Sequence, residues 1–148
     1  MKELDEIIYD ALMADETLAA DTEGRIICTC VEVPPTEDDN TPLPYIVIAE
    51  EPSQNEQGTK DSIWEAAADS VNVGVIVSAV TPSEVKRLRK LIRAAVENHV
   101  AEMDPSVCPY LRSLSWDGIA WDWMKPCYYD TLHYQCDMNA NIREYEQN

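Results

Sequence analysis

Basic charge and glycine are both scarce in this sequence. It has 11 Lys and Arg residues against 28 Asp and Glu residues, a formal net charge of -17, and 4 glycines among 148 residues. So acidic a chain repels nucleic acid at long range, because DNA-binding proteins neutralise phosphates with Lys and Arg. Phosphate-cradling loops are hard to build from so few glycines, and the common nucleotide-binding and hydrolase motifs are absent from the sequence. Tight DNA binding is therefore disfavoured, and we expect the protein not to be an enzyme.

The sequence also lacks a hydrophobic run long enough to span a membrane. The longest apolar stretch, residues 71–80, is interrupted by polar residues and glycine and reaches about half the required length. The first residues are acidic and lack the basic and apolar regions of a secretion signal. We therefore expect neither a membrane anchor nor signal-driven export.

Cysteine and histidine are present, but not with the spacing of a metal site. None of the five cysteines shows C-x2-C spacing, and His99 and His133 lie far apart in the sequence. We expect reduced thiols that pack as small hydrophobic residues, and no metal or other cofactor. Cys136 and His133 are three residues apart, but on a strand they would point to opposite faces, which rules out a Cys–His nucleophile pair.

The length fits one domain, residues 1–148, with a core over about residues 3–138 and a polar C-terminal tail at 139–148. Apolar periodicity predicts an amphipathic helix over residues 3–14. The sequence Thr81-Pro82-Ser83-Glu84 has the form of a capping box with proline at the first helical position, and it predicts a second amphipathic helix that runs to about residue 100.

Runs of β-branched residues predict strands at 25–33, 45–49 and 71–80, and alternation predicts a last strand at 128–138. The strand at 71–80 is apolar on both faces, which indicates a central position. Asp117-Gly118, set between alternating apolar residues, predicts the turn of a hairpin. The expected fold is α+β, a mostly antiparallel sheet of about four strands with two amphipathic helices packed on one face, plus a Trp-rich hairpin insert.

Residues 50–62 are almost wholly polar, which predicts a long loop of the kind that is functional or disordered in compact domains. A short helical turn or the start of a strand is expected around 63–68.

Charge is unevenly distributed along the chain. Residues 1–61 hold 16 acidic and 3 basic residues, whereas residues 62–103 hold 5 of each. The bases of the second segment fall on one face of the second predicted helix: Lys86, Arg87, Arg89, Lys90 and Arg93. A solvated face is the common explanation for such a run, and contact with an anionic partner is the alternative.

The segment beyond residue 105 is aromatic. Trp116, Trp121 and Trp123 lie close to Tyr128 and Tyr129 in the sequence. Such clusters fill cores or anchor interfaces, and the sequence leaves both open.

Several motifs follow one another along the chain. They are the opening helix, Gly24-Arg25-Ile26, Pro44-Tyr45-Ile46-Val47-Ile48 and its polar loop, residues 73–79 leading into Thr81-Pro82-Ser83-Glu84, the helix end Leu91-Ile92-Arg93-Ala94-Ala95-Val96, and the closing strand at 128–137. This arrangement resembles the tail-completion (tail-terminator, or minor tail) proteins of long-tailed bacteriophages and prophages. The resemblance covers residues 3–100 well and is looser over 104–126, where the Trp-rich insert departs from the expected pattern.

The resemblance implies a structural subunit of the virion tail, assembled in the cytoplasm of a bacterial host. Copies would form a hexameric ring at the head-proximal end of the tail tube, with tail-tube and head-tail connector proteins as partners and DNA passing through without tight binding. For the contact between copies we hypothesise opposite charges, and for contact with partners an aromatic surface of Trp116, Trp121 and Trp123. The charged residues are Glu50, Glu51, Glu56, Lys60, Asp61, Lys86, Arg87 and Lys90.

Two other functions stay open. A head-closure or head-tail joining protein has a similar size and also assembles as a ring, but its partners are different. A cellular acidic α+β module would use the aromatic residues to bind a protein or peptide.

Overall fold

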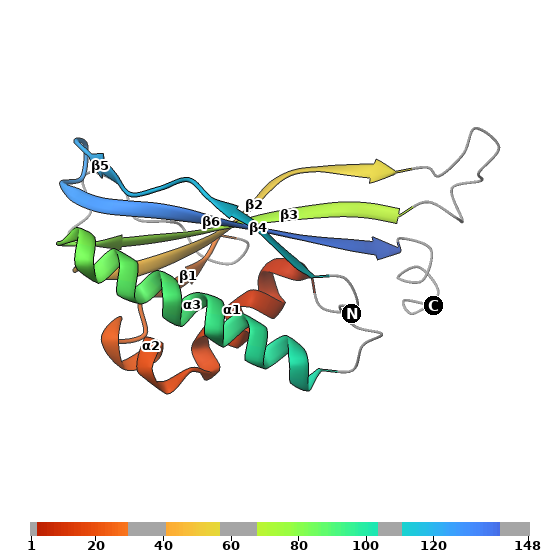
Figure 1. Ribbon diagram of the computed structural model, residues 1–148, viewed down its shortest axis with the longest axis horizontal. Coiled ribbons are helices and arrows are strands. Elements are labelled where there is room, and N and C mark those ends of the chain that lie inside the picture. Colours follow the sequence, from red (N-terminus) through yellow and green to blue (C-terminus); the bar gives the residue numbers. More distant parts are fainter. Residues whose placement is uncertain (1–2, 30–40, 57–67, 104–110, 140–148) are drawn as a thin grey trace.

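The computed structural model describes residues 3–29, 41–56, 68–103 and 111–139 (Figure 1). Along the chain these form α1 (Leu4–Ala14), α2 (Glu16–Asp21), β1 (Ile26–Cys28), β2 (Tyr45–Glu56), β3 (Ala68–Ala79), α3 (Pro82–Glu102), β4 (Arg112–Trp116), β5 (Ala120–Asp122) and β6 (Cys127–Asn139). The predicted α+β class is confirmed. The described part of the chain has six strands where about four were expected, and it has the short helix α2 in addition.

The strands form one sheet in the order β1-β2-β3-β6-β4, with β5 also paired to β6. β1 runs parallel to β2, and the other pairs are antiparallel. The predicted central position of residues 71–80 is confirmed, since β3 lies between β2 and β6. Residues 30–33 of the predicted first strand lie outside the described part.

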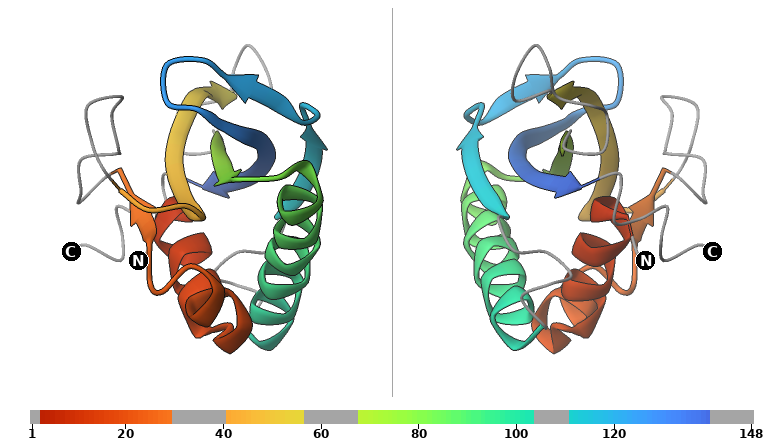
Figure 2. Two further views of the ribbon diagram at one scale, coloured as in Figure 1. Left: turned by 90° about the vertical axis from the view of Figure 1, so that its left-hand side faces the viewer. Right: turned by 90° about the vertical axis from the view of Figure 1, so that its right-hand side faces the viewer.

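The core lies between one face of the sheet and the helices α1 and α3, which both cover that face (Figure 2). Helical spacing places one apolar stripe of α3 inward, and alternation along β3 and β6 does the same for the strands. The residues that these three elements contribute to the hydrophobic core are Val85, Leu88, Ile92, Ala95 and Val96 of α3, Val71, Val73, Val75, Val77 and Ala79 of β3, and Leu132, Tyr134 and Cys136 of β6.

The start of α3 follows the predicted cap. The Thr81 side chain accepts a hydrogen bond from the Glu84 amide at 3.2 Å, and Pro82 occupies the first turn. The helix α2 was not predicted, because it is too short for its apolar period to be recognised. A side-chain cap begins that helix as well, because Asp15 accepts from the Leu18 amide at 3.0 Å.

The predicted loop at 50–62 is wrong in its first half. Residues 50–56 continue β2, and they pair with residues 68–73 of β3 across a bulge between Glu51 and Gln54. This end of the hairpin is held by backbone hydrogen bonds between β2 and β3. Because its side chains are polar, the sequence here lacks the alternation of apolar and polar residues that predicts a strand. Residues 57–62 lie outside the described part. The same holds for residues 63–67, whereas Ala68 begins β3.

The predicted hairpin at Asp117-Gly118 is also wrong. β4 and β5 do not pair with each other, since both pair with β6, and Gly118 (φ 100°) lies between them. Residues 117–119 lie between Trp116 and Ala120, whereas only residues 130 and 131 lie between the β6 partners of these two residues. This edge of the sheet therefore has one extra residue, a bulge, and the positive φ of Gly118 lies within it. The turn of the hairpin lies at residues 123–126, between β5 and β6, where the Asp122 carboxylate accepts from the Met124 amide at 2.9 Å.

The sheet is curled, with β2 and the β4–β5 edge turned toward each other on the side away from the helices (Figure 2). We call this side the concave face. Lys125 Nζ lies 5.0 Å from the centroid of the Tyr45 ring, which links the β5–β6 turn to β2. The concave face therefore brings side chains from distant strands together.

No helix in the described ranges has both the length and the apolar character needed to cross a membrane.

Candidate functional site

The basic face predicted for α3 divides into two parts. Lys86 and Lys90 are exposed, and Arg87 is half-exposed and bonds the Asp21 carboxylate of α2 at 2.6 Å. Arg89 turns toward the sheet, where it bonds the fully buried Asp130 at 2.7 Å. Of the three bases of α3 hypothesised for a subunit contact, Arg87 therefore already has a partner within its own chain.

Asp130 joins α3 to the edge of the sheet. Besides Arg89, its carboxylate accepts from the amides of Gly118 at 2.9 Å and Thr131 at 2.8 Å. A buried carboxylate is stable only when charge and hydrogen bonds compensate for lost water, and here both are supplied. The bulge at Gly118 is thereby fixed in place.

Trp116 lies under two guanidinium groups. The Arg89 and Arg93 Cζ atoms lie 5.0 and 5.1 Å from the centroid of its ring, the range of cation–π contact. The indole remains 43% exposed. Two of the predicted basic residues thus serve to hold one of the predicted aromatic residues.

Trp121 and Trp123 lie at the other end of the aromatic segment, on β5 and in the turn after it. Trp121 packs edge-on against Tyr128 at 4.8 Å and against Trp123 at 5.9 Å between ring centroids. Trp123 is 82% exposed, and its neighbour Met124 is 69% exposed. All three predicted aromatic residues are therefore at the surface and not in the core.

The acidic residues hypothesised for the subunit contact also lie in different places. Glu50 is exposed on β2 and lines a pocket of about 150 Å³ together with Glu3 and Glu6. The Glu51 carboxylate lies on the concave face, where it bonds His133. The backbone of Glu56 ends β2, and its side chain, together with Lys60 and Asp61, lies outside what the structure describes.

His133 bridges two carboxylates across the concave face. Its Nδ1 lies 2.8 Å from Glu51 Oε1 on β2, and its Nε2 lies 2.8 Å from Asp117 Oδ1 next to the bulge. Only the protonated imidazole donates from both nitrogens. The hydrogen bond to Glu51, with that to Asp117, raises the pKa of His133 above its ordinary value of 6.5, although burial acts against this.

Gly74 makes room for this bridge. It lies opposite His133 in the β3–β6 register, and a Cβ at this position would approach the Glu51 carboxyl carbon to 3.1 Å. A second row of polar contacts runs beside the bridge, from Arg112 through Gln135 to Asn72 at 2.6 and 3.0 Å. The concave face is therefore organised by hydrogen bonds between strands.

Cys136 and His133 lie on opposite faces of β6, as predicted, with Cys136 in the core under the helices. Cys28, Cys127 and Cys136 are buried and form no disulfide bond, which agrees with a packing role, and burial raises the pKa of Cys127. Cys30 and Cys108 lie outside the described part. Among the described residues, no group of three His, Cys, Asp or Glu side chains is arranged so that it could hold a metal ion.

A pocket of about 330 Å³ opens between the C-terminal half of α3 and the edge strand β4. Tyr134 of β6 contributes to its lining and is 2% exposed. Its hydroxyl is buried without a hydrogen-bond partner, and burial raises the pKa of Tyr134 to about 12. The remaining lining residues are Val96, Glu97, Val100, Ala101, Leu111 and Ser113. We call this the α3–β4 pocket.

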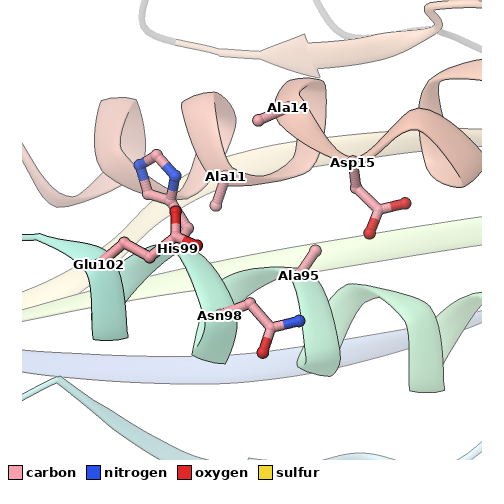
Figure 3. A pocket seen from close by; sticks show the side chains of 7 residues that line it. All are labelled: Ala11, Ala14, Asp15, Ala95, Asn98, His99 and Glu102. Atoms are coloured by element: carbon pink, nitrogen blue, oxygen red, sulfur yellow. The ribbon is translucent and has the colours of Figure 1, made fainter.

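A smaller pocket of about 140 Å³ lies where α1 and α3 cross (Figure 3). Ala11 and Ala95 face each other across it, and His99 with Glu102 stands at one end. The small side chains allow the two helices to approach closely, and this space is best explained by helix packing.

The sequence did not predict the His133 bridge, the Arg89–Asp130 pair or the α3–β4 pocket. Each joins residues that are more than 35 positions apart or that meet only through the curl of the sheet. The one available signal was Gly74, since a glycine within a central strand marks a close approach of another group.

No family model matches the sequence, and no curated protein matches it. Among solved structures, the fold is similar to that of a chain in the "Virion of native gene transfer agent (GTA) particle", with a TM-score of 0.50 and 18% sequence identity. The match covers 91% of this chain and 94% of that chain. At this identity the similarity is one of fold, and it extends over nearly the whole of both chains.

Proposed function

We propose that this protein is a structural subunit of a phage-like virion, and specifically a tail-completion (tail-terminator) subunit that forms a hexameric ring at the head-proximal end of the tail tube. The observation that carries the proposal is the fold similarity to a chain of the gene transfer agent virion over 91% of this sequence. The protein then acts through contacts with copies of itself and with tail and connector proteins, and makes or breaks no bond.

The placement of the charged candidates supports contact between copies. Glu50 pairs with Val73 of β3, whereas α3 begins beyond Ala79 at the other end of that strand. Glu50 lies beside Glu3 and Glu6 at the start of α1, whereas Arg87, between Lys86 and Lys90, bonds Asp21 of α2. The acidic and basic candidates therefore lie in different parts of the subunit. Acidic and basic surfaces that lie apart on one subunit suit a head-to-tail contact, which closes a ring when the rotation allows.

The net charge of -17 supports passage of DNA without binding. A compact chain of this length has a diameter of roughly 38 Å, and six touching in a circle leave a hole about as wide as one subunit. Such a hole admits duplex DNA. An acidic wall repels phosphates, so the DNA slides past without being held.

The test is addition of the purified protein to unjoined particle parts. A strain that makes the particle but lacks this gene is expected to yield separate heads and tails. We expect the purified protein to bind the tails, to appear as a ring at one tail end by electron microscopy, and to restore joining when heads are added. Binding to heads in place of tails would indicate head closure, and binding to neither would indicate a cellular function.

A charge variant sharpens the same test. Lys86→Glu together with Lys90→Glu reverses the two exposed bases of α3, and we expect fewer capped tails, with the deficit largest at low salt, where exposed charges are least screened. Ser83→Glu is the matched control, because it adds an acid to the same exposed helix without removing a base. Equal capping by the double variant and wild type at low salt would contradict the charge contact.

A further inference from the structure

The α3–β4 pocket has an unmet hydrogen-bonding requirement. Its volume is about 330 Å³, and the Tyr134 hydroxyl is buried beside it without a partner. Burying a hydroxyl without a hydrogen bond is unfavourable. The pocket therefore suits a group that is mostly apolar and carries one hydrogen-bonding atom.

Trp123 carries a side chain of the kind that suits this pocket. It is a large apolar side chain with a single donor, Nε1–H, and it is 82% exposed in the β5–β6 turn. Trp116 is held by two arginines, and Trp121 packs on Tyr128. Among the tryptophans that the structure describes, Trp123 is therefore the one most available to a partner.

Trp123 cannot enter the pocket of its own chain. The β5–β6 turn follows the Asp122–Cys127 pair, whereas the pocket lies at the Ser113–Tyr134 pair farther along β6. Seven residues of strand separate Cys127 from Tyr134, a distance of roughly 23 Å. Figure 1 shows β5 near one end of the molecule, while α3 runs from that end toward the other.

We propose that Trp123 of one copy inserts into the α3–β4 pocket of the next copy and donates its indole N–H to the Tyr134 hydroxyl oxygen. The sizes agree, since a cavity of about 150 Å³ accommodates benzene and this one is large enough for the two rings of indole. Buried indoles require such an acceptor. Because side chain and pocket lie at different places on the subunit, the contact is head-to-tail.

This inference rests on the self-association in the proposed function and names a contact for it. The two proposed contacts respond to salt in opposite ways, and the insertion predicts that the association as a whole strengthens as salt is added. A contact made by opposite charges weakens as salt is added, whereas an apolar insertion between two chains of net charge -17 strengthens, because salt screens the repulsion between them.

The test uses two variants that each lack one half of the contact. Trp123→Ala keeps the pocket and loses the inserted side chain, whereas Ala101→Trp fills the pocket from the exposed surface of α3 and keeps Trp123. By sedimentation velocity, wild type is expected to associate with rising concentration and salt, and each variant alone to stay monomeric. Their equimolar mixture should form a 1:1 dimer that grows no further, with a blue shift of tryptophan emission.

Of three further variants, one measures the contribution of the hydrogen bond and two are controls. Tyr134→Phe removes the acceptor, and we expect it to weaken association about fivefold. Ala94→Trp, on an exposed position of α3 that does not line the pocket, and Met124→Ala, beside Trp123, should associate as wild type does. Circular dichroism checks that all variants keep the fold.

Two results would overturn the inference. One is a mixture of Trp123→Ala and Ala101→Trp that remains monomeric under conditions where wild type associates. The other is wild type that stays monomeric at millimolar concentration in high salt. Neither would remove the proposed function, which is tested separately by binding of the protein to tails.

Discussion

The two faces of the sheet are held in different ways. Under α1 and α3 the face is apolar, with buried side chains such as Val75, Leu88 and Leu132 in direct contact. The concave face instead carries the bridge from Glu51 through His133 to Asp117 and a second row of polar contacts. Most of the free energy that stabilises the fold comes from burial on the first face. Apolar area removed from water contributes far more to this free energy than partly exposed ion pairs do. The second face contributes mainly shape, because its hydrogen bonds set where the edge strands lie.

The largest effect is expected from the apolar face. Leu88→Ala removes a fully buried side chain of α3, and we expect the free energy of unfolding to fall by about 3 kcal/mol through lost burial and the cavity left behind. Urea denaturation measures the change. Leu114→Ala, at an exposed position of β4, is the control and should change the free energy by less than about 0.5 kcal/mol. Equal losses in the two variants would mean that the helix layer does not dominate stability.

A somewhat smaller loss is expected at Asp130, a fully buried charged residue on the helix-covered side. Asp130→Asn keeps the shape of the side chain but removes the charge that pairs with Arg89, and we expect a loss of about 2 kcal/mol. A double-mutant cycle with Arg89→Met separates the pair from its surroundings. Additive losses in that cycle would show that the two groups do not act together.

On the concave face, Gly74→Ala tests the space left for the bridge. The new Cβ would lie 3.1 Å from the Glu51 carboxyl carbon, so the Glu51 side chain must shift by a few tenths of an ångström. We expect this shift to weaken its hydrogen bond to His133. We expect a loss of about 1 kcal/mol in stability, as for one net hydrogen bond, and a fall in the pKa of His133 toward its ordinary value. Titration followed by NMR measures the pKa. An unchanged pKa in this variant would show that Glu51 does not depend on the glycine.

The smallest effect is the pH dependence of the bridge. Because the folded state raises the pKa of His133, its stabilisation is fully present below 6.5 and is lost as the pH rises through the raised value. We expect less than about 1 kcal/mol, since Asp117 is largely exposed. The measurement is the free energy of unfolding between pH 5 and 9 for wild type minus that for His133→Gln. A difference that does not change with pH would contradict the bridge.

Sequence patterns predicted the apolar face and failed on the concave one. The helical period of α3, its Thr81 cap and the alternation in β6 are local signals, and the structure follows each. The polar end of β2 and the edge strand around Gly118 are fixed by pairing with distant strands, so local patterns suggested a loop and a hairpin in their place. The α3–β4 pocket needs α3, β4 and β6 together, and no short stretch of sequence encodes it.

The central claim is that the protein is a ring-forming part of a virion. Its most direct test is the copy number in purified particles, measured by quantitative mass spectrometry against the tail-tube protein. A hexameric ring predicts about six copies per particle, located at the head-tail junction, since a closed ring fixes the number. Particles that join heads to tails with no copy of this protein, or with a number that varies with tail length, would contradict the account.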